Sequence, residues 1–225
     1  MTDKTHLTRF TVLSFLALFM LAACAAVVRD QTRVAYRDPD FDARALRAGG
    51  LSILPVTAGQ GLEGYRRSLA EWMELHRQDA VPGGNVYGWR QSMERINEAD
   101  LSEVYEDIIR GYNTTAIINR KKVRQLAAGL RTRYALLPLL RDFSETTRVR
   151  YSPFVGMETE KKANVSLQCL VIDLIAGDVV LEISGQVGSV ANKYTVNRDY
   201  DTYARKLARA VLARLPGSAV SPKGR

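Results

Sequence analysis

The sequence predicts an α/β (α+β) protein with a single mixed sheet, a C-terminal antiparallel hairpin and about four packing helices. Three observations lead to this fold class. Apolar residues recur at helical spacing over residues 101–112, apolar and polar residues alternate over 165–187, and a nearly continuous apolar run covers 134–140. These patterns are typical of an amphipathic helix, of half-buried antiparallel strands and of a central strand buried on both faces.

The chain begins with the pattern of a bacterial export signal. Lys4 and Arg9 precede or flank a short apolar run at residues 10–20, and a Leu-Ala-Ala-Cys sequence ends at Cys24. A basic start, a short apolar core and small residues before a cut site are typical of a secretory signal peptide. The run is shorter than the ~20 apolar residues of a spanning helix. The ending resembles the lipobox of bacterial lipoproteins, so we expect residues 1–23 to be a signal peptide and Cys24 to be lipidated. An uncleaved anchor with an incidental cysteine is the alternative.

Length and composition indicate how many domains the rest of the chain forms and which partners its charge favours. Residues 24–225 have about the length of one domain, with 46% hydrophobic and 25% charged residues over the whole sequence. The net charge of +8 becomes +7 when Asp3, Lys4 and Arg9 leave with the signal peptide. Outside the cytoplasm this charge favours the lipid bilayer, cell-wall polymer or an acidic envelope protein as a partner, and not nucleic acid.

The first half of the mature chain reads as a tether, a strand and two helices. Residues 24–49 are expected to be the lipidated cysteine and its tether. A short strand follows over 51–56, with Pro55 at its end or at a bulge because proline cannot donate a ladder hydrogen bond. Apolar residues then fall on one helical face over 62–76, and a second helical stretch covers 91–96.

Helices and strands alternate through the second half. Asp100 and Asn119 are candidate N-caps of two further helices. The later expected elements are helices at 101–112 and 120–130, a strand at 134–140, an edge strand at 148–156, a hairpin at 165–187 turning at 176–178, and a helix at 203–215. One domain is therefore expected over 50–216, followed by a disordered tail over 217–225.

Three short patterns carry a resemblance to a group of bacterial envelope proteins. They are the strand Leu-Ser-Ile-Leu-Pro-Val at 51–56, the helix-to-strand passage at 123–137, and the hairpin at 171–180 with Asp173, Gly177 and Asp178 at its turn. Together they are similar to the periplasmic α/β domain of the curli secretion-pore lipoproteins (CsgG-like), the TolB amino-terminal domain and the lipoprotein activators of cell-wall synthases. The resemblance spans about residues 50–215. It implies a periplasmic fold and transfers no catalytic residue.

No motif has both the spacing and the sequence context of a catalytic, cofactor or metal site. Residues 59–64 read G-x-G-x-x-G, but the following helix ends in Val-Pro-Gly and does not lead to a second strand ending in an acid. His76 is the one histidine left after His6 is cleaved, which is too few for a zinc site. Cys169 stands on a buried strand, where a thiol is ordinarily a small hydrophobe. We therefore expect no enzyme activity, no cofactor and no metal.

Two surface features are candidates for partner binding. Arg120, Lys121 and Lys122 form the densest basic cluster, which could bind an anionic headgroup or an acidic partner. The alternative is an ordinary solvated helix face. Tyr87 and Trp89 lie in an aromatic loop and could anchor an interface, or they could fold back over the first helix.

These features predict a non-enzymatic periplasmic lipoprotein that acts as an adaptor, an activator or an envelope-assembly factor. Ala25 follows Cys24 where an aspartate would signal inner-membrane retention in enteric bacteria, so the outer membrane is expected. The alternative function is a subunit of an oligomeric outer-membrane secretion pore, as the curli resemblance implies. The spare segment for a membrane hairpin, 148–162, suits that role poorly because it contains Pro153 and several charges. An extracytoplasmic enzyme is a third alternative.

Overall fold

The computed structural model describes residues 28–59, 61–152, 156–192 and 200–221. The described residues form one seven-stranded mixed sheet and seven helices, which confirms the predicted fold class with more helices than the four expected. The strands are β1 (Val28–Arg37), β2 (Leu51–Ile53), β3 (Thr57–Ala58), β4 (Val86–Tyr87), β5 (Tyr134–Ser152), β6 (Gly156–Asp173) and β7 (Asp178–Asn192). The helices are α2 (Ala43–Gly49), α3 (Glu63–Leu75), α4 (Arg77–Ala80), α5 (Trp89–Glu98), α6 (Ser102–Thr115), α7 (Arg120–Leu130) and α8 (Tyr200–Leu212).

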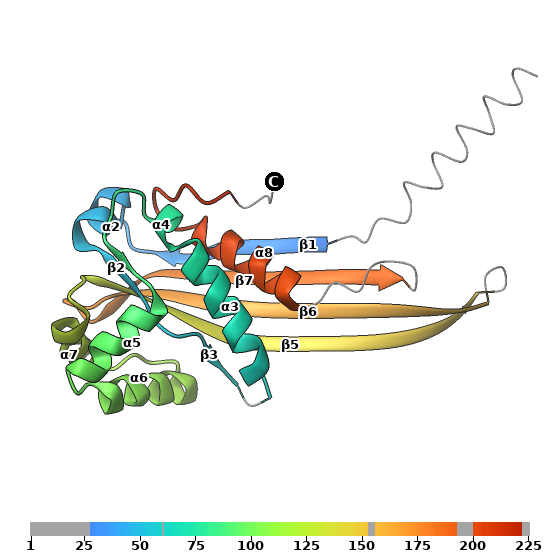
Figure 1. Ribbon diagram of the computed structural model, residues 1–225, viewed down its shortest axis with the longest axis horizontal. Helices are drawn as coiled ribbons and strands as arrows, with labels where there is room; N and C mark the ends of the chain where they lie inside the picture. Colours follow the sequence, from blue (N-terminus) through green and yellow to red (C-terminus); the bar gives the residue numbers. More distant parts are fainter. Residues whose placement is uncertain (1–27, 60, 153–155, 193–199, 222–225) are drawn as a thin grey trace, which may run out of the picture.

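The sheet joins a parallel part to an antiparallel part. Its order is β1-β7-β6-β5-β2-β4, and β3 pairs with β5 beyond the end of β2 (Figure 1). β2 is parallel to both β4 and β5, whereas β5, β6, β7 and β1 are antiparallel in succession. The break between β2 and β3 includes Pro55, as predicted, because its ring nitrogen has no hydrogen to donate. The predicted C-terminal hairpin is β6–β7.

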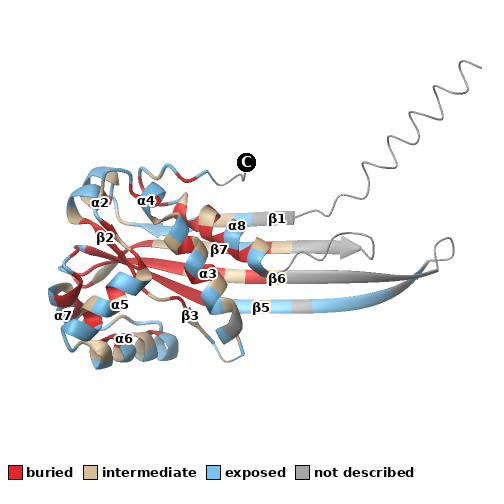
Figure 2. Ribbon diagram, in the orientation of Figure 1, coloured by how far each residue is buried: buried red, intermediate tan, exposed pale blue. Residues whose placement is uncertain are grey.

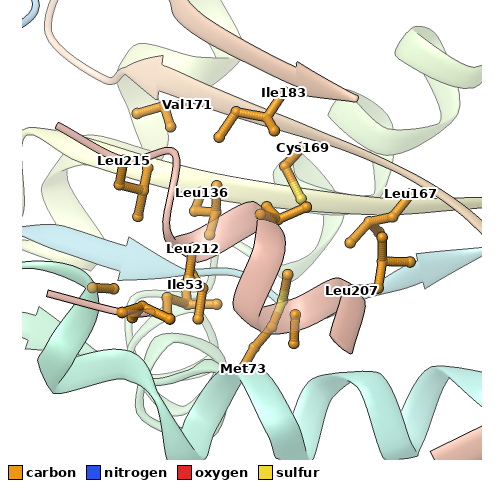
Figure 3. Packing of buried hydrophobic residues seen from close by; sticks show 14 of the residues in the cluster. Ile53, Met73, Leu136, Leu167, Cys169, Val171, Ile183, Leu207, Leu212 and Leu215 are labelled. Carbon is orange, nitrogen blue, oxygen red and sulfur yellow. The ribbon is translucent and has the colours of Figure 1, made fainter. Parts of the chain in front are cut away.

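Helices pack on both faces of the sheet, with α3 and α8 on one face and α5, α6 and α7 on the other. On one face the core contains Met73 from α3 and Leu207 from α8, which pack with Leu136 and Cys169 from the strands (Figure 3). On the other face a second cluster contains side chains of α5, α6 and α7, with Leu137 from β5. β5 contributes to both clusters because successive side chains of a strand point to opposite faces. The apolar run at 134–140 is therefore buried, as expected for a central strand.

The antiparallel strands extend far past the helices. β5 has 19 residues and β6 has 18, and the outer part of β5 is exposed (Figure 2). The register aligns Val28, at the start of β1, with Ser189, which pairs with Ala163, which pairs with Glu145. The part of the β5–β6 hairpin beyond Glu145 thus lies past the beginning of β1.

Two expected boundaries differ in the structure. Residues 28–37 were expected in the tether but form β1, which pairs along β7 at the sheet edge. Asp42 caps α2, its Oδ1 accepting from the Ala45 N–H at 2.7 Å. The sheet therefore includes residues 28–37, which precede the expected start of the domain at Gly50. The sequence of β1 hides it because an edge strand carries polar residues on both faces.

The other differences concern the hairpin and the tail. The segment expected as a separate edge strand at 148–156 is the continuation of β5, which pairs with β6 as far as Ser152. Pro153 lies outside the described residues. The expected disordered tail, 217–225, is anchored at its start: the Ala219 N–H donates to the Asp79 carbonyl at 2.8 Å, and Val220 is buried in the core. A single apolar side chain is too short a pattern to predict such a contact.

Candidate functional site

The basic cluster is largely engaged within the chain. The Arg120 guanidinium pairs with Asp178 at 2.6 Å, and Lys122 Nζ donates to Asp107. That hydrogen bond from Lys122 lowers the pKa of the Asp107 carboxyl. Lys121 is exposed and alone among the three has no ion pair with any described residue. Considering the described residues alone, the cluster presents one unpaired cation where the sequence suggests three, and its role in partner binding stays a prediction.

The aromatic pair packs against its own surroundings. The Arg95 guanidinium lies 3.5 Å from the centroid of the Tyr87 ring, and Asn85 donates to the Tyr87 hydroxyl at 2.7 Å. Arg90 stacks over the ring of Trp89 at 4.6 Å. Tyr87 and Trp89 are both half-buried. This favours the alternative in which the two aromatic side chains fold back onto the domain over the one in which they are free anchors for a partner.

The junction between β4 and α5 fixes the position of Trp89. The Trp89 N–H donates to Glu74 Oε2 on α3 at 3.1 Å. Gly88 is the N-cap of α5, and a Cβ atom there would overlap the Glu74 carboxylate. A glycine at this position therefore lets α3 and α5 approach each other closely.

The two other singled-out side chains have structural surroundings. His76 follows the end of α3, with its ring centroid 6.1 Å from that of Trp72, and burial together with nearby Arg209 lowers its pKa. Cys169 is buried, as predicted, and burial raises the pKa of its thiol. Among the described residues no group of three His, Cys, Asp or Glu side chains could hold a metal ion.

The parallel strands create a switch point in the sheet. From β2 the chain passes to α3, whose buried side chains belong to one core cluster, and from β4 it passes to α5, whose Ile96 belongs to the other. The two strands are neighbours, so the chain segments that follow their carboxyl ends part toward opposite faces. In open α/β sheets this arrangement leaves a crevice where ligands commonly bind.

A groove occupies that crevice. It has a volume of about 700 Å³ and lies between α3, α5, α6 and the β2–β3 connection. Val56, Ala70, Met93 and Ile109 supply apolar lining, and four arginines also line it: Arg66, Arg67, Arg90 and Arg110. Its size is within the range of small-molecule sites. We refer to it as the switch-point groove.

Sequence reasoning missed this groove. Residues 86–89 were interpreted as a connection, because β4 is only two residues long, and without that strand the β2–β4 pair that creates the switch point is not visible. Only Trp89, among the residues singled out as candidates, lines the groove. One sequence signal could have indicated the groove: a strand before Pro55, a helix, and a second strand before Gly88 follow one another along the chain, which is the order of a parallel pair.

The free end of the β5–β6 hairpin exposes apolar side chains. Val149 is 62% and Tyr151 is 76% exposed, and the two lie on the same face of β5 because they are two residues apart. Within the described part of the chain, no helix is both long and apolar enough to cross a membrane. Cys24, the predicted lipidation site, lies outside the described residues.

The sequence matches no protein-family model and no curated protein. Among solved structures, a PelC dodecamer from Paraburkholderia phytofirmans is similar with a TM-score of 0.45 and 13% identity, over 85% of this chain and 97% of that one. The hypothetical protein CT253 from Chlamydia trachomatis has a TM-score of 0.46 and 12% identity, over 75% and 96%. Lipoprotein GNA1162 from Neisseria meningitidis has a TM-score of 0.32 and 13% identity, over 73% and 95%. At these identities and TM-scores the similarities assign neither a family nor a role to this chain.

Proposed function

We propose that this protein is a non-enzymatic lipoprotein, held by Cys24 on the periplasmic side of the outer membrane, that acts as an adaptor, activator or envelope-assembly factor. The observation that carries the proposal is the distance along the chain between Cys24 and the sheet. Three residues, 25–27, separate the cysteine from Val28, the first residue of β1. A lipid on Cys24 would therefore hold the sheet directly at the membrane surface.

Chain geometry then orients the molecule. The four steps from Cys24 to Val28 reach at most about 14 Å. The hairpin continues from Glu145, level with Val28, to Ser152, which is about 24 Å at ~3.4 Å per residue. With its strands upright on the membrane, the hairpin end would reach at least about 10 Å past the anchor point.

The end of the hairpin suits the membrane interface. Exposed Val149 and Tyr151 share one face, and Arg148, which directly precedes Val149, is also exposed. Tyrosine rings concentrate at the headgroup level of bilayers, and cations there meet anionic lipids. We propose that this end contacts lipid while the helical end faces the periplasm and its partner.

A pore subunit is the second candidate function. The length of β5 and β6 favours it, since 19 and 18 residues exceed the ~9–11 that a membrane strand needs. The segment past Glu145 reaches only about 24 Å, which is less than the ~30 Å hydrocarbon core. A hairpin of that reach supports contact with one leaflet better than a full crossing.

The first test is the anchor itself. Cys24→Ser should leave an unprocessed precursor or release the protein from the membrane fraction, because stable anchoring takes two acyl chains or more. A processed, membrane-bound Cys24→Ser protein would refute the lipoprotein proposal. Density-gradient fractionation of the wild type would identify the outer membrane, and cross-linking in intact cells with mass spectrometry would identify the partner.

The second test concerns orientation. An environment-sensitive fluorophore on Tyr151→Cys should shift to the blue and be quenched by brominated lipid when the lipidated protein is reconstituted in vesicles. The matched control is Ile175→Cys, which is 63% exposed in the native protein and lies in the β6–β7 turn at the opposite end of β6. Quenching at position 175 and none at 151 would reverse the proposed orientation. Discrete conductance steps in planar bilayers would instead favour the pore.

A further inference from the structure

We infer that the switch-point groove binds a single-chain anionic amphiphile, with the acyl chain on its apolar lining and a carboxylate or phosphate head beside its arginines. This inference is independent of the lipid anchor, because the groove belongs to the helical end of the domain and no residue of the hairpin end lines it.

Charge complementarity points to an anion. Four arginines and one carboxylate, Glu106, line the groove. Two of the arginines have acidic neighbours on their own helices: Arg67 pairs with Glu71 at 3.0 Å, and Arg110 lies 3.6 Å from Asp107.

The charge of the other two arginines is not paired with an acidic group among the described residues, although Arg90 stacks over the Trp89 ring at 4.6 Å. Arg66 on α3 and Arg90 on α5 form no ion pair with any described residue, and both are exposed. They lie on different helices of the same groove, so one anionic head could meet both. Guanidinium groups bind carboxylates and phosphates through two parallel hydrogen bonds, which favours such a head over a neutral one.

Two further donors of the groove are poorly used. Tyr105 is only 8% exposed, and its hydroxyl is 3.5 Å from the Pro55 carbonyl, which is long for an O–H···O hydrogen bond. Burial raises the pKa of Tyr105, so the hydroxyl keeps its proton and remains a donor. The Nε1–H of Trp89 is buried without an acceptor among the described residues. A buried donor without a partner is unfavourable.

The apolar part of the groove lining indicates that the ligand carries an acyl chain. Val56, Ala70, Met93 and Ile109 offer aliphatic surface, and methionine adapts to flexible apolar partners. An acyl chain fits this lining because it needs no hydrogen bonds, whereas a peptide would bring backbone groups that these side chains cannot pair. An amphiphile of about twelve carbons is within the size range of ligands for such a volume.

The test is calorimetry with the mature chain, residues 24–225, produced without its lipid. The probes are dodecanoate, dodecyl phosphate and dodecyltrimethylammonium, each below its critical micelle concentration. Saturable binding of one or both anions, at least about tenfold tighter than the cation, supports the inference. The tighter of the two anions tells a fatty-acid source from a phospholipid-derived one. Equal binding of all three probes, or no saturable binding of either anion, would overturn it.

Matched variants locate the site. The double change Arg66→Glu and Arg90→Glu should weaken the anion by about tenfold or more. The control, Arg44→Glu with Lys121→Glu, changes the net charge equally at exposed positions outside the groove and should leave the affinity unchanged. Ile109→Trp, at a half-buried position of the lining, should fill the groove and reduce binding of any probe. Unchanged affinity in the arginine double variant, with circular dichroism confirming the fold, would overturn the inference.

Discussion

The surroundings of Cys169 determine the reactivity of its thiol. The thiol is fully buried in the core between the sheet and α8, and burial raises its pKa because the thiolate loses its hydration. Since the thiolate is the reactive form, the side chain should be inert in the folded protein.

We expect thiol labelling of Cys169 to be slow in the native protein at pH 7 and at pH 9, and fast after denaturation. The two pH values should differ little, because the raised pKa keeps the thiol protonated at both. Tyr151→Cys, at an exposed site, is the control and should label rapidly without denaturant. Rapid native labelling of the wild type would mean that the hairpin presents its other face to the core.

Variants of the basic cluster and of His76 distinguish a binding protein from an enzyme. Charge reversal at Lys121 should weaken partner capture, more strongly at low salt, because exposed charges are screened over about 8–10 Å at physiological ionic strength. Reversal at Arg120 and Lys122 as well should add a structural effect, since these two pair with Asp178 and Asp107. His76→Ala should leave capture intact in a folded protein. Loss of function with His76→Ala alone, measured by the same cross-linking assay, would favour an enzyme.

Among the elements, α3 and α8 are joined by a small polar contact. Asp201 on α8 accepts from the Ser68 hydroxyl at 2.6 Å and from Trp72 Nε1 at 2.7 Å, both on α3. These hydrogen bonds, the one from Ser68 first, lower the pKa of the Asp201 carboxyl below its ordinary value of 3.8. A group whose pKa is lower in the folded state stabilises the fold above its unfolded pKa.

We therefore expect Asp201→Ala to lower the free energy of unfolding at pH 7 by about 1 kcal/mol or less, the range of exposed hydrogen bonds. The difference from the wild type should shrink as the pH falls below 3.8 and through the lowered folded pKa, because the carboxylate is then protonated in both states. Urea unfolding followed by tryptophan fluorescence measures it. Asp40→Ala, at an exposed residue whose carboxylate accepts no hydrogen bond from described residues, is the control. A difference that grows toward acid pH would contradict this account.

Sequence patterns were reliable where one face of an element is buried. The helices expected at 62–76, 101–112 and 120–130 are α3, α6 and α7, within a few residues, because their apolar stripes are long enough to define a period. β1 and β4 were missed for opposite reasons. β1 is an edge strand with polar residues on both faces, and β4 has only two residues.

At the scale of the whole molecule, the switch-point groove could not be derived from sequence. Its lining comes from three helices and one connection, between residues 55 and 110, and no local spacing marks it. Tertiary packing alone brings Arg66 and Arg90 to one site. The sequence also did not predict that β5 and β6 form one long projecting hairpin. The charges and Pro153 in 148–162 suggested a separate edge strand there and not the continuation of β5.

The pairing of β1 with β7 also governs when this fold can be completed. Val28 pairs with Ser189, which lies more than 150 residues later in the chain, so β1 can join the sheet only after β7 is available. Pairings of such long sequence separation form slowly, since a large loop must close first. If Cys24 is acylated as predicted, its acylation would therefore take place before β1 closes the edge of the sheet. Membrane attachment would then precede the final step of folding, and the acylated end would be fixed to the surface on which that last strand docks.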